Sequence, residues 1–227
     1  LSSDPAMNWA VPELEDKTIV SFSDAHSLPK LGRELTAFQG DLSYQGLADA
    51  LANQGVAYSV EFYPEEGKYY YDGHRKCGVC QPLAEIPIQA GPCAVCGKTL
   101  TLGVLNRTVS LSEGKVDGTR GGDGFVQSTA GRPPFIRLVP LQEIIAEVLG
   151  QSPNTKKVQS VYFKVIEEVG SELQVLINAN HHDLAGASGE RIAQAIIHVR
   201  AGNIQVEPGY DGVFGKVSIA SADLLRF

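Results

Sequence analysis

Hydrophobic and polar residues follow two different periods along this chain. Apolar residues at helical spacing predict helices over residues 43–55, 140–150 and 155–169, and the first of these ends in a glycine. Strand-like patterns occur at 17–22, where apolar residues run together, and at 57–63, where apolar and polar residues alternate. The mixture of both periods predicts an α+β protein.

The remaining pattern divides the chain into segments. Residues 1–55 are predicted to form the end of an α/β domain, and residues 56–110 a ribbon that contains all the cysteines. Residues 111–135 are rich in Gly, Ser and Asp, which predicts a flexible loop. Residues 136–227 are predicted to be mainly helical and to close in a β-hairpin. Within them, 182–202 is predicted to form a loop, a helix and a glycine cap.

The start of the chain bears on its extent. The first residue is Leu1 rather than Met, and a buried strand is already predicted at 17–22. We therefore expect the chain to be the C-terminal part of a longer protein.

Composition narrows the function classes only slightly. The chain has 227 residues, is 43% hydrophobic and carries a formal net charge of −7. This balance excludes a surface coated in positive charge but leaves room for a local basic groove. No apolar run approaches the roughly 18 to 20 residues that a membrane span needs, so we expect no membrane partner.

The four cysteines form two C-x-x-C pairs separated by 12 residues. Gly78 and Gly97 allow the tight turns that would bring the sulfurs together. Four thiolates close a tetrahedral shell, so the pattern predicts a structural Zn²⁺ site rather than redox dithiols or unrelated buried thiols. Such clustering is typical of a reducing compartment and predicts a cytoplasmic location. The predicted ligands are Cys77, Cys80, Cys93 and Cys96.

The second cysteine pair lies in a stretch that also resembles a phosphate-binding loop, GPCAVCGKTL. Such a loop requires G-x-x-x-x-G-K-S/T followed by a helix. Here five residues separate Gly91 from Gly97, and the following KTLTLGVLNRTV favours strands. The zinc interpretation is therefore preferred over an ATPase or helicase-associated protein.

A short polar motif, SDAHS, follows the predicted strand at 17–22. Asp24 and His26 offer one carboxylate oxygen and one imidazole nitrogen to a divalent metal. By spacing alone, an Asp that caps the next helix, with an exposed His, is the competing interpretation.

Two further stretches allow more than one interpretation. Residues 61–77 place aromatic rings among cations, which suits nucleic acid but is also typical of a Tyr-rich hairpin with solvated charges. Residues 184–196, LAGASGERIAQAI, are similar to a helix-hairpin-helix turn. Ser188 stands where that motif has its second glycine, so an ordinary packing corner is preferred.

Taken together, several strings resemble consecutive signatures of the endonuclease Q family. They include FSDAHSLPKLGRE, EFYPEEGKYYYDGHRKCGV, CAVCGKTLTLGVLNR, PFIRLVPLQEIIAEVLG and VEPGYDGVFGKV. The resemblance implies a PHP (polymerase and histidinol phosphatase) metallohydrolase domain joined to a zinc-binding domain and a helical C-terminal region. It also implies a DNA repair endonuclease that cuts on the 5′ side of deaminated bases (uracil, hypoxanthine, xanthine) or abasic sites.

The resemblance assigns roles to the candidate residues. Asp24 and His26 match the last metal-binding motif of the PHP domain, D-x-H, and would hold a catalytic divalent ion (Zn²⁺, Mg²⁺ or Mn²⁺). DNA is the implied partner, with a sliding clamp as a further candidate. Our own hypothesis adds a pocket for the damaged base. It would be formed by Lys68, Tyr69, Tyr70, Tyr71, His74 and Arg75.

The chain also departs from the family pattern. No H-x-H motif precedes Asp24, and His181 and His182 are adjacent. We therefore expect this chain alone to be inactive, although a longer parent would be a nuclease. The alternative function is a non-catalytic zinc-ribbon module that binds nucleic acid.

Overall fold

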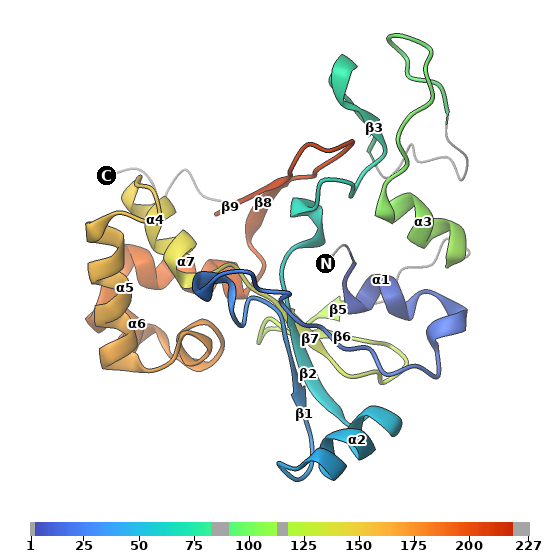
Figure 1. Cartoon of the computed structure of the whole chain (residues 1–227). Helices are drawn as coiled ribbons and strands as arrows, with labels where there is room; N and C mark the ends of the chain where they lie inside the picture. Colours follow the sequence, from blue (N-terminus) through green and yellow to red (C-terminus); the bar gives the residue numbers. More distant parts are fainter. Residues whose placement is uncertain (1–2, 83–90, 113–117, 220–227) are drawn as a thin grey trace. The chain divides into compact units, whose positions relative to one another are not determined.

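The computed structural model describes residues 3–82, 91–112 and 118–219. The chain divides into two compact units, each described here by itself (Figure 1). Unit 1 comprises Leu1–Gly121, Phe125–Ile136 and Val206–Val217, and unit 2 comprises Gly122–Gly124, Arg137–Gln205 and Ser218–Phe227.

Unit 1 is built on a five-stranded sheet with the strand order β1-β2-β7-β6-β5. β1 runs antiparallel to β2, and β6 runs antiparallel to both of its neighbours. Because β1 and β2 belong to one sheet, the structure does not separate residues 1–55 from the segment that follows. The strands are β1 (Leu35–Phe38), β2 (Val56–Glu61), β5 (Thr119–Arg120), β6 (Val126–Gln127) and β7 (Phe135–Arg137).

Helices complete the core of unit 1. In α1 (Pro5–Trp9), the indole of Trp9 packs edge-to-face on Phe135 at 5.4 Å between ring centroids. A second cluster joins Met7 of α1 to Leu105 of α3 (Val104–Leu111). α2 (Tyr44–Ala52) begins at Ser43, whose hydroxyl accepts the Gly46 N–H, and confirms the helix predicted over 43–55.

Short elements make up the rest of this unit. They are the 3₁₀ helices η1 (Pro12–Leu14), η2 (Leu28–Lys30), η3 (Pro64–Glu66) and η4 (Arg75–Cys77), and the two-stranded sheet of β3 (Gly73–His74) and β4 (Val79–Cys80).

The strand predicted at 17–22 is not formed. The Ser21 N–H donates to the Thr36 hydroxyl instead of to a strand backbone, and Phe22 is 61% exposed. β1 is the terminal strand of its sheet and pairs with β2 alone among the described strands. An apolar run predicts a strand, but a strand also requires a neighbour to receive its main-chain hydrogen bonds.

Two other predictions in unit 1 need correction. The stretch KTLTLGVLNRTV contains helix α3, because the Gly103 N–H at its start donates to the buried Asp72 carboxylate at 2.6 Å. This tertiary contact outweighs the strand preference of the local β-branched residues. The segment 111–135, predicted as a flexible loop, contributes β5 and β6 to the sheet; its residues 113–117 lie outside the described part.

Unit 2 is a helical bundle in which α4 packs on α5 and α7, and α6 packs on α5 and α7. α4 (Leu141–Leu149) and α5 (Lys156–Val169) confirm the helices predicted over 140–150 and 155–169. A π-helix, η6 (Gln174–Asn178), follows α5. The fully buried side chains of the bundle include Leu141, Ile144, Ile145, Val158, Val165, Val175, Leu184, Ile196 and Val199.

The loop predicted at the start of 182–202 is instead helix α6 (His181–Ser188), followed by α7 (Glu190–Arg200). The single residue Gly189, with φ of 86°, joins the two helices. Because α6 continues through Ser188, where a helix-hairpin-helix module would turn, this segment is a packing corner. Strands β8 (Ile204–Glu207) and β9 (Lys216–Ile219) form the predicted terminal hairpin.

No helix in the described part of the chain combines the length and the apolarity that crossing a bilayer would require.

Candidate functional site

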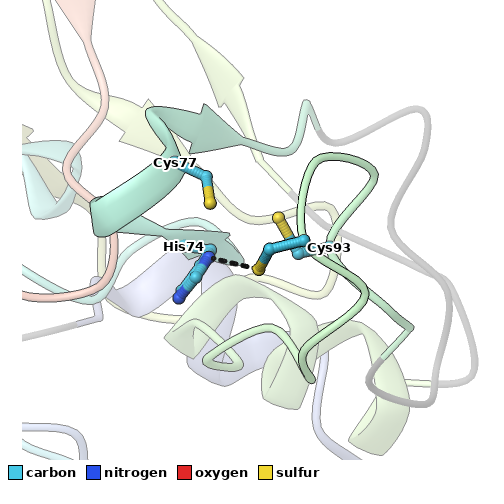
Figure 2. Close-up of side chains that lie close together, drawn as sticks. His74, Cys77 and Cys93 are labelled. Carbon is cyan, nitrogen blue, oxygen red and sulfur yellow. Dashed lines mark hydrogen bonds between the residues drawn. The ribbon is translucent and has the colours of Figure 1, made fainter.

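One group of metal-ligating side chains stands out in the described residues of unit 1. The ligand atoms of His74, Cys77, Cys93 and Cys96 all lie within 4.8 Å of one another. Figure 2 shows the side chains of His74, Cys77 and Cys93 directed toward a common point. A tetrahedral zinc with bonds of about 2.0–2.3 Å separates its ligand atoms by roughly 3.3–3.8 Å. The donor set is therefore compatible with a closed, structural zinc site, whose ligand atoms would lie closer together than the 4.8 Å limit of this group.

The first half of the group is a turn between two short strands. β3 pairs antiparallel with β4, so that His74 faces Val79 across the ladder. Between them lies η4, which ends at Gly78 with φ of 66°. This left-handed conformation suits glycine and allows the chain to turn sharply after Cys77.

The second half repeats this geometry. The Cys93 N–H donates to the Lys98 carbonyl at 2.7 Å, and the Gly97 N–H donates to the Cys93 carbonyl at 2.8 Å. Gly97 has φ of 71°, and Pro92 pairs with Thr99 in an antiparallel bridge. The GKT sequence therefore lies in the turn that carries Cys93 and Cys96, and the next helix begins only at Val104, which argues against the phosphate-loop interpretation.

The structure brings His74 into this group, whereas the sequence predicted Cys80 as the fourth ligand. Cys80 lies on β4 opposite Gly73 and is not a member of the group. Both turns follow the same pattern, ligand-x-x-Cys-Gly, which reads HRKCG in the first and CAVCG in the second. The glycine after Cys77 was the sequence signal for this arrangement, because Cys80 is followed by Gln81.

Hydrogen bonds within the group separate the acidities of its thiols. The backbone N–H groups of Cys96 and Val95, together with His74, lower the pKa of Cys93 to about 6. Burial, with hydrogen bonds to Cys96 and Cys93, raises the pKa of Cys77 to about 11. A thiol ionised near neutral pH favours metal capture, because the thiolate is the ligand. The Cys96 sulfur lies 3.4 Å from His74 Nδ1.

The Asp24–His26 loop forms a second, more open site. The imidazole Nδ1 of His26 lies 2.8 Å from the Asp24 carbonyl oxygen, which leaves Nε2 available to a ligand. Asp24 has φ of 47°, a left-handed conformation that is uncommon outside glycine. The loop borders a depression of about 230 Å³ lined by Ser23, Asp24, Ala25, His26, Ser27, Lys30, Arg33 and Phe62.

This loop offers two metal donors, and the described residues bring no third ligand into a group with them. Cations adjoin it. Arg33 forms a salt bridge with Glu66 at 2.7 Å, and its guanidinium lies 4.8 Å from the centroid of the Phe62 ring. The loop therefore places two possible metal donors beside a depression that Lys30 and Arg33 line.

The predicted base-binding residues lie in three different settings. Tyr70 is buried in the core cluster with Met7, and Tyr71 packs against that cluster. His74 belongs to the metal group. The exposed remainder consists of Lys68, Tyr69 and Arg75.

Glu61 is a buried carboxyl group that the sequence did not single out. It is 3% exposed and accepts hydrogen bonds from the hydroxyls of Ser59 and Ser21. Burial raises its pKa to about 7, against the opposing effect of these hydrogen bonds. Its bond to Ser21 anchors the segment that leads into Asp24.

Comparisons with known proteins identify relatives over almost the whole chain. The MJ0043 C-terminal domain family matches residues 140–203. The protein MJ0043 of Methanocaldococcus jannaschii is 32% identical over 96% of this chain and 27% of its own length. The protein YqxK of Bacillus subtilis is 30% identical over 96% of this chain and 51% of its own length.

Solved structures are also similar to this chain over its whole length. The lesion-specific endonuclease PfuEndoQ from Pyrococcus furiosus superposes with a TM-score of 0.80 and 28% identity, over 100% of this chain and 55% of that one. Endonuclease Q in complex with a 27-mer duplex that has an abasic lesion at the active site gives a TM-score of 0.77 at 28% identity, over 100% of this chain and 56% of that one.

The chain thus spans between a quarter and somewhat more than half of the length of these proteins. Its sequence and its α+β fold, with a Cys/His metal group and a terminal hairpin, are similar to one part of endonuclease Q.

Proposed function

We propose that this chain is the zinc-binding and helical portion of a DNA repair endonuclease that acts on damaged bases or abasic sites. The observation that carries the proposal is the similarity to endonuclease Q over the full length of the chain. The structure of that enzyme with an abasic duplex supports DNA as the partner. A sliding clamp stays a prediction from the sequence.

In this proposal the Asp24 carboxylate and His26 Nε2 hold a divalent ion together with ligands from outside this chain. That ion would supply activation of water and neutralisation of phosphate charge. The Asp24 carbonyl fixes the orientation of the His26 ring through Nδ1. Lys30 and Arg33 line the same depression and would contact the DNA phosphate, with Arg33 shared between that phosphate and Glu66. The Cys/His group does no chemistry and holds the two turns together.

The first test measures DNA binding by the chain as it is. Fluorescence anisotropy should show tighter binding to a 27-mer duplex with an abasic site than to the intact duplex. Equal or absent binding to both would contradict recognition of a lesion.

The second test measures cleavage. The chain alone should not cut the abasic duplex, because two donors do not form a metal cage. A chimera that adds the part of YqxK to which this chain has no counterpart should cut on the 5′ side of the lesion. Asp24→Asn and His26→Gln should each lower its rate on the order of 100-fold or more, while Asp41→Asn, on an exposed carboxylate, should not.

A non-catalytic nucleic-acid-binding module is the second candidate. It is favoured by one observation: the Cys/His group is the complete ligand set among the described residues. A chimera that binds the abasic duplex but whose cleavage is absent or insensitive to Asp24→Asn would select this function.

A further inference from the structure

Two segments that are far apart in the sequence lie side by side near the metal group (Figure 1). They are the string 64–75 and the loop 208–215 between β8 and β9. The Gly209 N–H donates to the Glu65 carbonyl at 2.8 Å, and the Gly215 N–H donates to the Glu66 carbonyl at 3.0 Å. The Gly212 N–H donates to the Lys68 carbonyl at 2.9 Å. These main-chain bonds fix the loop along the string.

The approach is so close that glycine is required. A Cβ atom on Gly209 would collide with the Gly67 carbonyl oxygen, and one on Gly215 would collide with the Glu65 carbonyl oxygen. The loop is therefore a built structure whose tip is held in a defined place.

Asp211 ties this loop to both metal-binding turns. Its carboxylate accepts the Arg75 N–H at 2.6 Å and the Thr101 hydroxyl at 2.7 Å. Arg75 lies inside the first turn, and Thr101 follows the second. These bonds use the Asp211 carboxylate internally, and the Asp72 carboxylate is buried and bonded to Gly103 and Asn106, so both carboxylates are turned toward the protein.

The exposed side chains beside this loop include two aromatic rings and two cations. Phe214 is 70% exposed and Tyr69 is 51% exposed. The Lys68 ammonium lies 4.4 Å from the centroid of the Phe214 ring. Neither Lys68 nor Arg75 forms a salt bridge with a described residue. We call these four residues (Lys68, Tyr69, Arg75 and Phe214) the Lys68–Phe214 patch.

We propose that the Lys68–Phe214 patch binds an unpaired nucleotide, with the Phe214 ring stacked on the base and Lys68 and Arg75 on the adjoining phosphates. Only a partner with both an anionic group and a flat π-face uses every member of the patch. A base inside a duplex has its faces covered by its neighbours, so the ring requires a base that has left the stack or lies beside a gap.

This inference rests on the proposed function and adds Phe214, from a distant segment, to the surface that reads the damaged strand. Aromatic stacking contributes roughly 5- to 100-fold in affinity per base. Lys68 should contribute affinity that weakens as salt rises, because it neutralises a phosphate.

The experiment titrates the full chain into a duplex that carries 2-aminopurine beside an abasic site, and into the same duplex without the lesion. Wild type should quench the 2-aminopurine fluorescence of the lesion duplex by stacking. Phe214→Ala should abolish the quench and weaken binding roughly 5- to 100-fold, and Phe214→Trp should restore both. Lys68→Ala should weaken binding and flatten its dependence on salt.

Phe163→Ala is the matched control, because Phe163 of α5 is 65% exposed and lies in unit 2. If Phe214→Ala behaves like Phe163→Ala while wild type binds the lesion duplex, the patch proposal is wrong and the proposed function stands. If wild type binds neither duplex, both are wrong. If poly-glutamate binds with the same loss in Phe214→Ala, the patch takes an acidic peptide, and the nucleotide proposal is overturned.

Discussion

The two candidate metal sites of unit 1 differ in how their ligands are held. In the Cys/His group, each turn supplies two ligands, a positive-φ glycine closes it, and the ligand atoms already lie within 4.8 Å of one another. In the Asp24–His26 loop, both side chains are exposed, and the described residues add no third ligand. Two turns supply the whole donor set of the Cys/His group, whereas the Asp24–His26 loop would need further ligands from elsewhere to hold an ion.

The two sites also differ in the hydrogen bonds that hold them in place. The Cys/His group is backed by buried polar contacts such as that between Asp72 and Gly103. The segment that leads into the Asp24–His26 loop is held by bonds from Ser21 to Thr36 and to Glu61, a carboxyl group whose charge is disfavoured by burial. Substitutions in the Cys/His group should therefore destabilise the fold around it. Substitutions in the Asp24–His26 loop should mainly weaken the proposed binding of a metal ion.

The largest expected effect is the loss of bound zinc, and it should distinguish His74 from Cys80 as the fourth ligand. Cys93→Ser and His74→Ala should each lower bound zinc from about one ion per chain to near zero, with a large loss in Tm, because a structural zinc supplies folding free energy. Cys80→Ser should retain the zinc, and His74→Cys should retain it as a fourth thiolate. Metal analysis of the purified chain and thermal denaturation measure both.

The reverse result, zinc lost in Cys80→Ser and kept in His74→Ala, would restore the four-cysteine site predicted from the sequence.

The next largest effect concerns the buried hydrogen bonds of Asp72 and is measured as a change in the free energy of unfolding. Asp72 is 1% exposed and accepts the Gly103 N–H and the Asn106 side-chain amide, both at 2.6 Å. Asp72→Ala leaves two buried donors unsatisfied, so the free energy of unfolding should fall by about 3 kcal/mol in urea denaturation. Asp41→Ala, on an exposed carboxylate, should change it by less than about 0.5 kcal/mol. Equal losses would show that the Asp72 bonds do not stabilise unit 1.

The stability that Glu61 contributes next to the Asp24–His26 loop should depend on pH. Burial raises the pKa of Glu61 from 4.5 to about 7. The folded state therefore holds this proton more tightly, and the resulting stability is complete below pH 4.5 and lost as pH rises through 7. Between these values the loss should reach about 3 kcal/mol.

Glu61→Gln removes this titration. Its free energy of unfolding relative to wild type should rise by about 3 kcal/mol between pH 4.5 and pH 8, as measured by urea denaturation. Glu13→Gln, on an exposed side chain, should show no such trend. A relative stability that is flat with pH would mean that Glu61 ionises without penalty.

The smallest effect concerns strain at the Asp24–His26 loop. Because Asp24 has φ of 47°, Asp24→Gly should raise the free energy of unfolding by up to about 1 kcal/mol, although it removes a proposed metal ligand. Asp41→Gly should instead be neutral or slightly destabilising. A loss of stability in Asp24→Gly would mean that the Asp24 carboxylate contributes to the fold.

Local patterns predicted the elements whose information lies within the element itself. The amphipathic helices over 140–150 and 155–169 formed as α4 and α5, and the alternation at 57–63 formed β2. These segments carry their own buried stripe or face, so a short window of sequence contains most of the physics that decides them.

Elements that depend on partners were not predictable in this way. The run 17–22 has the composition of a strand but no described neighbour that gives it a ladder. The start of 182–202 has a weak periodic pattern, yet it becomes α6 because Leu184 and Ala187 are buried in the bundle. In both cases the deciding contact lies outside the segment.

The sequence by itself determined that this chain is an α+β protein with cysteines clustered for a metal, and it predicted a D-x-H metal motif at Asp24 and His26. Only the tertiary structure decided which side chains meet. It brought His74 rather than Cys80 to the sulfur group, buried Tyr70 in the core, and placed Phe214 over Lys68 from a loop more than a hundred residues away. Composition and spacing report which chemistry a chain carries, whereas the convergence of distant segments depends on main-chain hydrogen bonds and packing that no local window contains.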